Sequence, residues 1–210
     1  SYMAPEAVKA IEHNIFTPGN YFYNGVGHVT VNYGEVLEIG LEGIKQKAEA
    51  ALLKCTPDLP DYAKRHAFLE AVIESLDAAV LYAERYSEAA YMEANACREP
   101  KRKEELFRIA ENCKSVPRKG AKSFREACQS FWFIQMLIQT ESSGHSISPG
   151  RFDQYMYPYY KADLDSGRIT REEAQELIDC IWVKLNDLNK ARDAASSEGF
   201  AGYSLFQNLI

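Results

Sequence analysis

The sequence lacks the cysteine spacings that form zinc sites or disulfide frameworks. Its 210 residues contain five cysteines, an odd number, at long spacings and without a C-x-x-C pair. Such cysteines are typical of a reducing compartment, so a cytoplasmic location is expected. No metal site is predicted, because no other histidine lies close enough to His145 in the sequence to make a ligand pair.

Long apolar runs and clusters of uncompensated basic residues are also absent. No run reaches the roughly 18 apolar residues that a membrane span requires, and the opening Ser1–Pro5 does not resemble a signal peptide. The formal charge is −6, and the one basic cluster, Arg98 with Lys101–Lys103, is neutralised by neighbouring glutamates. Neither a membrane nor a nucleic acid is therefore expected as a partner.

What the sequence does have is helical periodicity. Residues 1–34 are crowded with glycine, proline and asparagine and are expected to be irregular, with a short extended segment at 28–33. Apolar residues then recur at three- and four-residue steps. They predict a helical region at 35–141, and a region at 142–210 with a polar loop, two helices and a closing strand. The predicted helices are at about 35–52, 61–96, 100–114, 123–140, 152–165 and 170–185.

Helix-start signals support these boundaries. Pro100 suits a first helical turn. Ser123 with Glu126, and Thr170 with Glu173, have the spacing of capping boxes. The helix from Ser123 is apolar around most of its circumference, so it should be buried on several sides. The extended segments are too few for a sheet, so the chain is either all-α or part of a larger fold.

A polar loop separates two of these helices. It reads E-S-S-G-H-S-I-S-P-G-R-F-D-Q-Y from Glu141 to Tyr155. Gly144 is a natural left-handed cap, and His145 at a helix C-terminus suits a structural role as well as a functional one. The serines can be capping residues only, and the absence of a G-x-S-x-G elbow disfavours a hydrolase. Arg151 and Asp153 are expected to be structural anchors.

His28 follows a Gly-Val-Gly sequence at residues 25–27. A phosphate-binding loop is disfavoured, because no strand precedes it and no helix follows at once. Either the glycines form a close-packed turn, or they free space around an imidazole that faces a cavity. The residues alone leave both interpretations open.

The stretch G-H-S-I-S-P-G-R-F-D-Q-Y-M-Y-P-Y-Y, residues 144–160, resembles a hallmark of glycyl radical enzymes of the pyruvate formate-lyase-like branch. Residues 25–44 and 201–210 are similar to other segments of the same proteins. The resemblance implies a predominantly α fragment of an α/β fold, a ten-stranded β/α barrel. Residues 1–210 would form one internal fragment of that domain, with 142–210 holding an active-site loop, two helices and a barrel strand.

Within that family, His28, His145 and Ser146 match the hydroxyl-binding residues of the B12-independent glycerol and propane-1,2-diol dehydratases. The resemblance implies that His145 contacts the leaving hydroxyl, that Ser146 orients the substrate and that His28 holds a second hydroxyl. Gly144, Arg151 and Asp153 would support the loop. Choline lyases and hydroxyproline dehydratases are similar too, and Ser142-Ser143 departs from the Ser/Thr-Asn typical of this position.

The Gly-Cys-Val-Glu and Arg-Val-x-Gly-Tyr loops of these enzymes do not occur in this sequence. The chain is therefore expected to bind no cofactor itself and to be inactive alone. The glycyl radical would lie in a missing C-terminal part, installed by a radical S-adenosylmethionine activating enzyme. The full-length enzyme would be an anaerobic, homodimeric lyase acting on a small polyol in the cytoplasm or a bacterial microcompartment. The alternative is a non-catalytic helical binding or scaffold protein derived from the fold.

Overall fold

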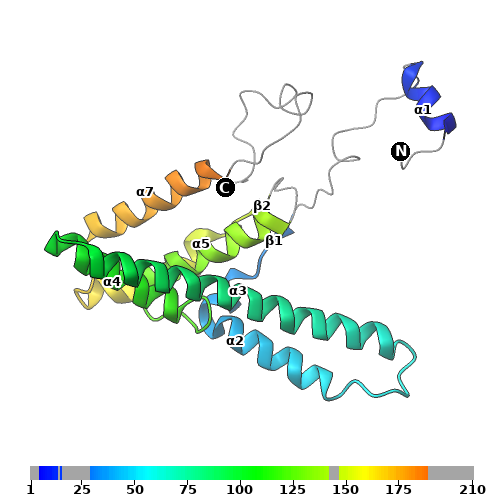
Figure 1. Ribbon diagram of the computed structural model, residues 1–210, viewed down its shortest axis with the longest axis horizontal. Coiled ribbons are helices and arrows are strands. Elements are labelled where there is room, and N and C mark those ends of the chain that lie inside the picture. Colours follow the sequence, from blue (N-terminus) through cyan, green and yellow to red (C-terminus); the bar gives the residue numbers. More distant parts are fainter. Residues whose placement is uncertain (1–4, 14, 16–28, 142–146, 189–210) are drawn as a thin grey trace.

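The computed structural model describes residues 5–13, 15, 29–141 and 147–188 of the chain (Figure 1). The described part is predominantly helical, as predicted. Its elements in chain order are α1 (Pro5–Glu12), β1 (Val29–Thr30), α2 (Tyr33–Leu52), α3 (Tyr62–Ala96), α4 (Pro100–Ser115), α5 (Phe124–Glu141), β2 (Ile147–Ser148), α6 (Phe152–Asp165) and α7 (Arg171–Asp187).

The expectation that residues 1–34 are irregular is wrong at the start of the chain, where α1 forms. Pro5 occupies its first position, Glu6 lies in the first turn and Lys9 in the last. Proline is pre-organised for a first helical turn, and these charges complement the helix dipole. No residue of α1 is buried. The short extended segment is confirmed as β1, and the predicted closing strand at 200–210 lies outside the described residues.

The predicted helix starts are confirmed, with one change in hydrogen bonding. Pro100 stands at the start of α4. At α5, the Ser123 hydroxyl accepts from the Glu126 N–H at 3.1 Å, but the Glu126 carboxylate accepts from the Lys122 N–H at 2.6 Å instead of from Ser123. The second bond of the box is thus displaced by one residue, and the first still satisfies an N–H group, that of Glu126, which the helix itself leaves unpaired.

The capping box of α7 is complete. The Thr170 hydroxyl accepts from the Glu173 N–H at 3.1 Å, and the Glu173 carboxylate accepts from the Thr170 N–H at 2.9 Å. Thr170→Ala is expected to lower the free energy of unfolding by about 1 kcal/mol, the usual cost of losing such a cap. Urea denaturation measures the change. Thr170→Ser keeps the hydroxyl and should restore most of it; equal losses in both variants would contradict the capping role.

The helix α5 lies at the centre of the fold, as its apolar circumference predicted. It contacts α2, α4, α6, α7 and β2. Phe131 and Phe133 are almost completely buried, and they belong to two different hydrophobic clusters. Burying such a ring stabilises the fold by roughly 1.5–3 kcal/mol. The main cluster around α5 contains Tyr33, Val36, Leu37, Leu41, Phe124, Ala127, Cys128, Phe131, Ile134, Met156, Ile169, Ala174, Ile181 and Leu185.

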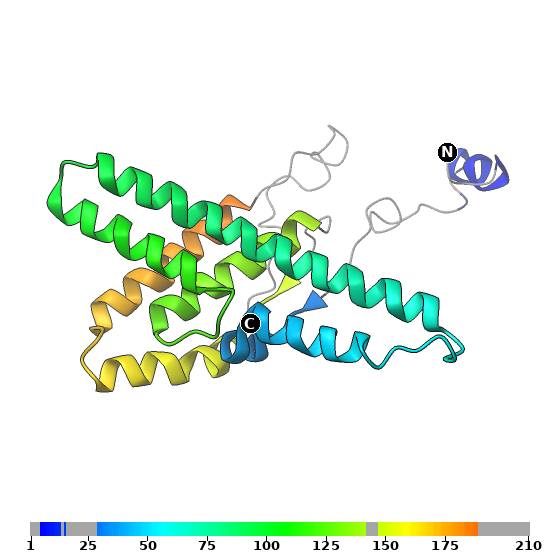
Figure 2. The ribbon, with the colours of Figure 1, turned by 60° about the horizontal axis from the view of Figure 1, so that its bottom comes forward.

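The long helix α3 is lined by two other helices. Figure 2 shows α2 along one half of it and α4 along the other half. A small second cluster joins α3, α4 and α5 through Ala83, Cys113 and Phe133. The pair α3–α4 therefore braces one side of α5 and leaves the other sides to α2, α6 and α7.

The helix α2 is interrupted at Gly40, whose φ of 68° and ψ of 175° are not helical. The backbone groups freed by the break bond to the loop at residues 117–121. The N–H groups of Leu41 and Glu42 donate to the carbonyls of Pro117 and Arg118 at 2.8 and 3.0 Å, and Ala121 donates to the carbonyl of Leu37 at 2.8 Å. The break is thus stabilised from outside the helix, because buried backbone groups need partners.

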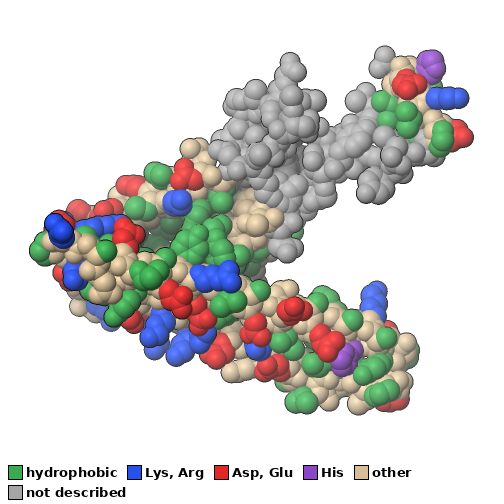
Figure 3. Space-filling view, viewed as in Figure 1, with side chains coloured by type: hydrophobic (Ala, Val, Ile, Leu, Met, Phe, Trp, Pro, Cys, Tyr) green, Lys and Arg blue, Asp and Glu red, His purple; other side chains and the backbone are tan. Residues whose placement is uncertain are grey.

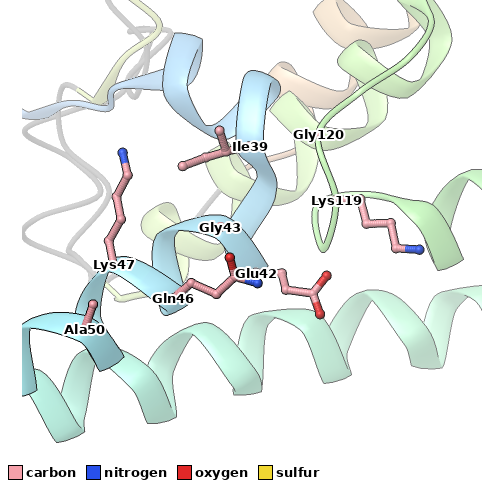
Figure 4. A pocket seen from close by; sticks show the side chains of 8 residues that line it. All are labelled: Ile39, Glu42, Gly43, Gln46, Lys47, Ala50, Lys119 and Gly120. Atoms are coloured by element: carbon pink, nitrogen blue, oxygen red, sulfur yellow. The ribbon is translucent and has the colours of Figure 1, made fainter. Parts of the chain in front are cut away.

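Gly120 allows this close approach. A Cβ on Gly120 would lie 2.8 Å from the carbonyl carbon of Glu38. Figure 4 shows the loop with Lys119 and Gly120 passing α2 beside an open depression of ≈ 500 Å³, which is lined by Ile39, Glu42, Gly43, Gln46, Lys47, Ala50, Lys119 and Gly120. None of the site residues predicted from the sequence lines this depression.

Candidate functional site

The two short strands bring two distant parts of the sequence together. β1 and β2 pair in parallel, with Val29 opposite Ile147 and Thr30 opposite Ser148. Gly150, at a φ of 67°, lies so close to β1 that a Cβ would be 2.8 Å from the Thr30 methyl group. The predicted site residues His28, Gly144, His145 and Ser146 lie outside the described residues, and two of them directly precede Val29 and Ile147 in the sequence.

A buried polar residue on α5 connects β2 with the start of α2, the helix that follows β1. Gln135 is completely buried. Its Oε1 accepts a hydrogen bond from the Tyr33 hydroxyl, and its Nε2 donates to the Ile147 carbonyl at 3.1 Å. Tyr33 is the first residue of α2, shortly after β1. Our sequence reasoning missed this network; the available signal was a glutamine within an otherwise apolar helix.

A second tyrosine holds the far end of β2. The Tyr155 hydroxyl donates to the carbonyl of Pro149 at 2.8 Å, and its ring stacks on Tyr33 with centroids 5.4 Å apart. Burial raises the pKa of both phenols well above the usual range. Both hydroxyls therefore stay protonated at any physiological pH and remain hydrogen-bond donors.

Arg151 and Asp153 contact each other. Arg151 Nε and Nη2 donate to the two carboxylate oxygens of Asp153, each at 3.0 Å, and both side chains are mostly exposed. This hydrogen bond and the opposite charges raise the pKa of Arg151 and lower that of Asp153. The pair lies at the start of α6, one residue after Gly150. Its predicted role as an anchor of residues 142–146 stays a prediction.

Comparison with known proteins places the chain in a family. The model of that family, described as pyruvate formate lyase-like, matches residues 1–210. The chain belongs to the pyruvate formate lyase-like family.

Two solved structures resemble this pyruvate formate lyase-like chain over 99% of its length. One, from Roseburia inulinivorans, is described for 1,2-propanediol dehydration; it is 63% identical with a TM-score of 0.93. The other is the glycerol-bound B12-independent glycerol dehydratase of Clostridium butyricum, 53% identical with a TM-score of 0.91. The chain covers 25% and 26% of these two proteins. The predicted fold class is thus confirmed.

A curated relative supports the same assignment. The (2S)-3-sulfopropanediol dehydratase of Klebsiella oxytoca is 38% identical over 200 residues, which are 93% of this chain and 24% of the relative. The pyruvate formate lyase-like chain therefore spans about a quarter of the length of the relatives it matches.

The cysteines of this pyruvate formate lyase-like chain are all free thiols, and two are deeply placed in the core. Burial raises the pKa of Cys113 to about 11 and that of Cys128 to about 12. Both thus remain protonated and unreactive near neutral pH. Among the described residues, no group of three or more histidine, cysteine or acidic side chains could hold a metal ion.

One face of the described part exposes apolar side chains. Figure 3 shows them gathered in a hollow between α7 and the α3–α4 pair, over α5. Trp182 on α7 is 54% exposed and Tyr86 on α3 is 48% exposed. Within the described ranges, no helix is both long enough and apolar enough to cross a bilayer.

Proposed function

We propose that this chain forms one wall of the substrate site of a glycyl radical lyase that dehydrates a vicinal diol, glycerol or propane-1,2-diol. The observation that carries the proposal is the parallel pairing of Val29 with Ile147, directly after His28 and Ser146 in the sequence. Because neighbouring Cα atoms are about 3.8 Å apart, this pairing favours a common site for the two preceding residues. The compounds named for the two similar structures, 1,2-propanediol and glycerol, support a diol.

The side chains of this segment would bind and orient the substrate. His145 would donate a hydrogen bond to the leaving hydroxyl, because an imidazole can supply a proton near neutral pH. Ser146 would orient the diol, and His28 would hold its second hydroxyl. A glycyl radical and a cysteine elsewhere in the proposed longer protein would supply the hydrogen abstraction. Loss of water from propane-1,2-diol leaves propanal.

The proposal extends to the whole protein. A radical S-adenosylmethionine enzyme would activate a cytoplasmic homodimer. We expect the parent gene to encode Gly-Cys-Val-Glu and Arg-Val-x-Gly-Tyr loops beyond the present residues. Sequencing the flanking DNA tests this, and a gene without either loop favours the alternative, a helical scaffold derived from the fold.

His145→Ala in the full-length enzyme is expected to lower turnover of both glycerol and propane-1,2-diol at least about tenfold, because a positioned proton donor is lost. Turnover is measured anaerobically and divided by the amount of glycyl radical, which electron paramagnetic resonance quantifies. His66→Ala is the matched control, since His66 lies on the surface of α3 beside Glu70 at 3.1 Å. Unchanged turnover of both diols in His145→Ala would refute the assigned role. Assays with choline and 4-hydroxyproline separate the diol from the other substrate classes.

A further inference from the structure

The pairing of β1 with β2 is too short to fix its own geometry. Each strand has two residues. Even a complete two-stranded hairpin is only marginally stable in water, and parallel pairs are slightly weaker per residue than antiparallel ones. The relative position of Val29 and Ile147 must therefore be set by groups outside the ladder.

Gln135 contacts β2 directly and contacts the first residue of α2, which follows β1. Its amide is fully buried, and it uses opposite atoms for the Tyr33 hydroxyl and the Ile147 carbonyl. A buried amide pays a large desolvation cost when it lacks partners, so these two bonds strongly favour one geometry. The Ile147 carbonyl lies at the first residue of β2, directly after Ser146 in the sequence.

Tyr155 completes the arrangement from the opposite end of β2. Its hydroxyl binds the carbonyl of Pro149, which is fully buried, and its ring packs on Tyr33. Phe131 packs on Tyr33 as well, with the two ring centroids 4.9 Å apart. The strand β2 is thus held at both ends by side chains of α5 and α6, and the same side chains hold Tyr33 after β1.

We propose that Gln135, Tyr33 and Tyr155 are positioning residues of the substrate site, which fix β2 relative to the segment that links β1 to α2 and so set how the two strands lie beside each other. This inference rests on the proposed function of His28, His145 and Ser146. In this role the three residues would not need to contact the substrate or the radical. They act through the backbone of β2 and the turn between β1 and α2.

Tyr155→Phe in the full-length, radical-bearing enzyme tests the proposal. The substitution keeps the ring and removes only the bond to the Pro149 carbonyl. Tyr160→Phe is the matched control, because Tyr160 lies on the same helix and packs its ring on Phe124 with centroids 5.6 Å apart. Both variants are compared with the parent enzyme by hydrogen–deuterium exchange and by anaerobic kinetics per glycyl radical.

In Tyr155→Phe, amide exchange in peptides covering residues 147–150 is expected to accelerate about tenfold, because one restraint on local opening is lost. The kcat for propane-1,2-diol is expected to fall about tenfold with a change in KM below about threefold, since misplaced groups orient the transition state poorly. Tyr160→Phe should match the parent enzyme in both measurements. A merely structural role would lower the yield of folded enzyme and leave kcat per radical unchanged.

Each other outcome decides the matter. Unchanged exchange at 147–150 would show that Tyr155 does not hold β2. Accelerated exchange with normal kcat, alongside a slow His145→Ala enzyme, would overturn the positioning role and leave the proposed function intact. Unchanged diol turnover in His145→Ala would overturn the proposed function. A parent enzyme that is inactive on every diol would overturn both the proposed function and the positioning role.

Discussion

Gly40→Ala is expected to lower the free energy of unfolding by about 4 kcal/mol or more, a loss seen only for a few mechanisms. Gly40 combines two of them. Its backbone angles, φ 68° and ψ 175°, belong to a region that is essentially restricted to glycine. A Cβ there would also collide with the Arg118 carbonyl and lie 2.6 Å from Lys119 Cα. These are backbone atoms, so no side-chain rotation relieves the clash. Urea denaturation measures the loss, provided that the variant and the parent protein have the same m-value.

Gly167→Ala is the control for backbone strain alone. Gly167 has a φ of 71°, and apart from its own chain neighbours no atom lies within 4 Å of where its Cβ would be. It should cost only about 1–2 kcal/mol, the penalty of a left-handed residue. Gly120→Ala tests the steric clash alone, because a Cβ there would collide with Glu38 although φ is not positive. If Gly40→Ala and Gly167→Ala lost the same free energy, the tight junction between α2 and the loop at 117–121 would contribute nothing.

Asp163→Ala is expected to lower the free energy of unfolding by about 3 kcal/mol, because hydrogen bonds to a charged group are each worth about 1.5–3 kcal/mol. Asp163 is only 3% exposed. One carboxylate oxygen accepts from the Phe124 N–H, the first of α5, at 2.7 Å, and the other accepts from Arg168 Nε at 2.7 Å. Its loss leaves a buried helix-start N–H unpaired, whereas the half-exposed Arg168 can turn to water.

Asp165→Ala offers a matched comparison two residues away on the same helix. Asp165 accepts from Lys161 at 2.7 Å, but both side chains are more than half exposed. Such surface pairs contribute about 0–1 kcal/mol. Thermal and urea unfolding of the two variants should therefore differ clearly. Equal stabilities would mean that Asp163 does not tie the end of α6 to the start of α5.

Local signals in the sequence predicted the helices well. The periodicity and Pro100 placed α4, and the Thr170–Glu173 spacing placed the start of α7. Local signals could not predict the break in α2, because Gly40 reads as one small residue in a regular apolar pattern. Its geometry depends on the loop at 117–121, which packs there only in the folded chain.

The candidate site was predicted from resemblance, and its supporting groups were not. Physical reasoning alone left His145 between a helix cap and a functional residue. Gln135 and Asp163 went unrecognised because their partners, Tyr33 and Phe124, are distant in the sequence. A buried amide or carboxylate signals that a partner exists, but it does not say which residue supplies it.

The bond between Tyr33 and Gln135 has a consequence for how the chain folds. The two residues are 102 positions apart. Closing a loop of that size costs about 4 kcal/mol of chain entropy, so the contact is favourable only after α2 to α5 have packed. We therefore expect the β1–β2 region to be unstructured in the transition state for folding and to form only after it. A weakened Tyr33–Gln135 contact would then leave the folding rate nearly unchanged and shorten the lifetime of the native state.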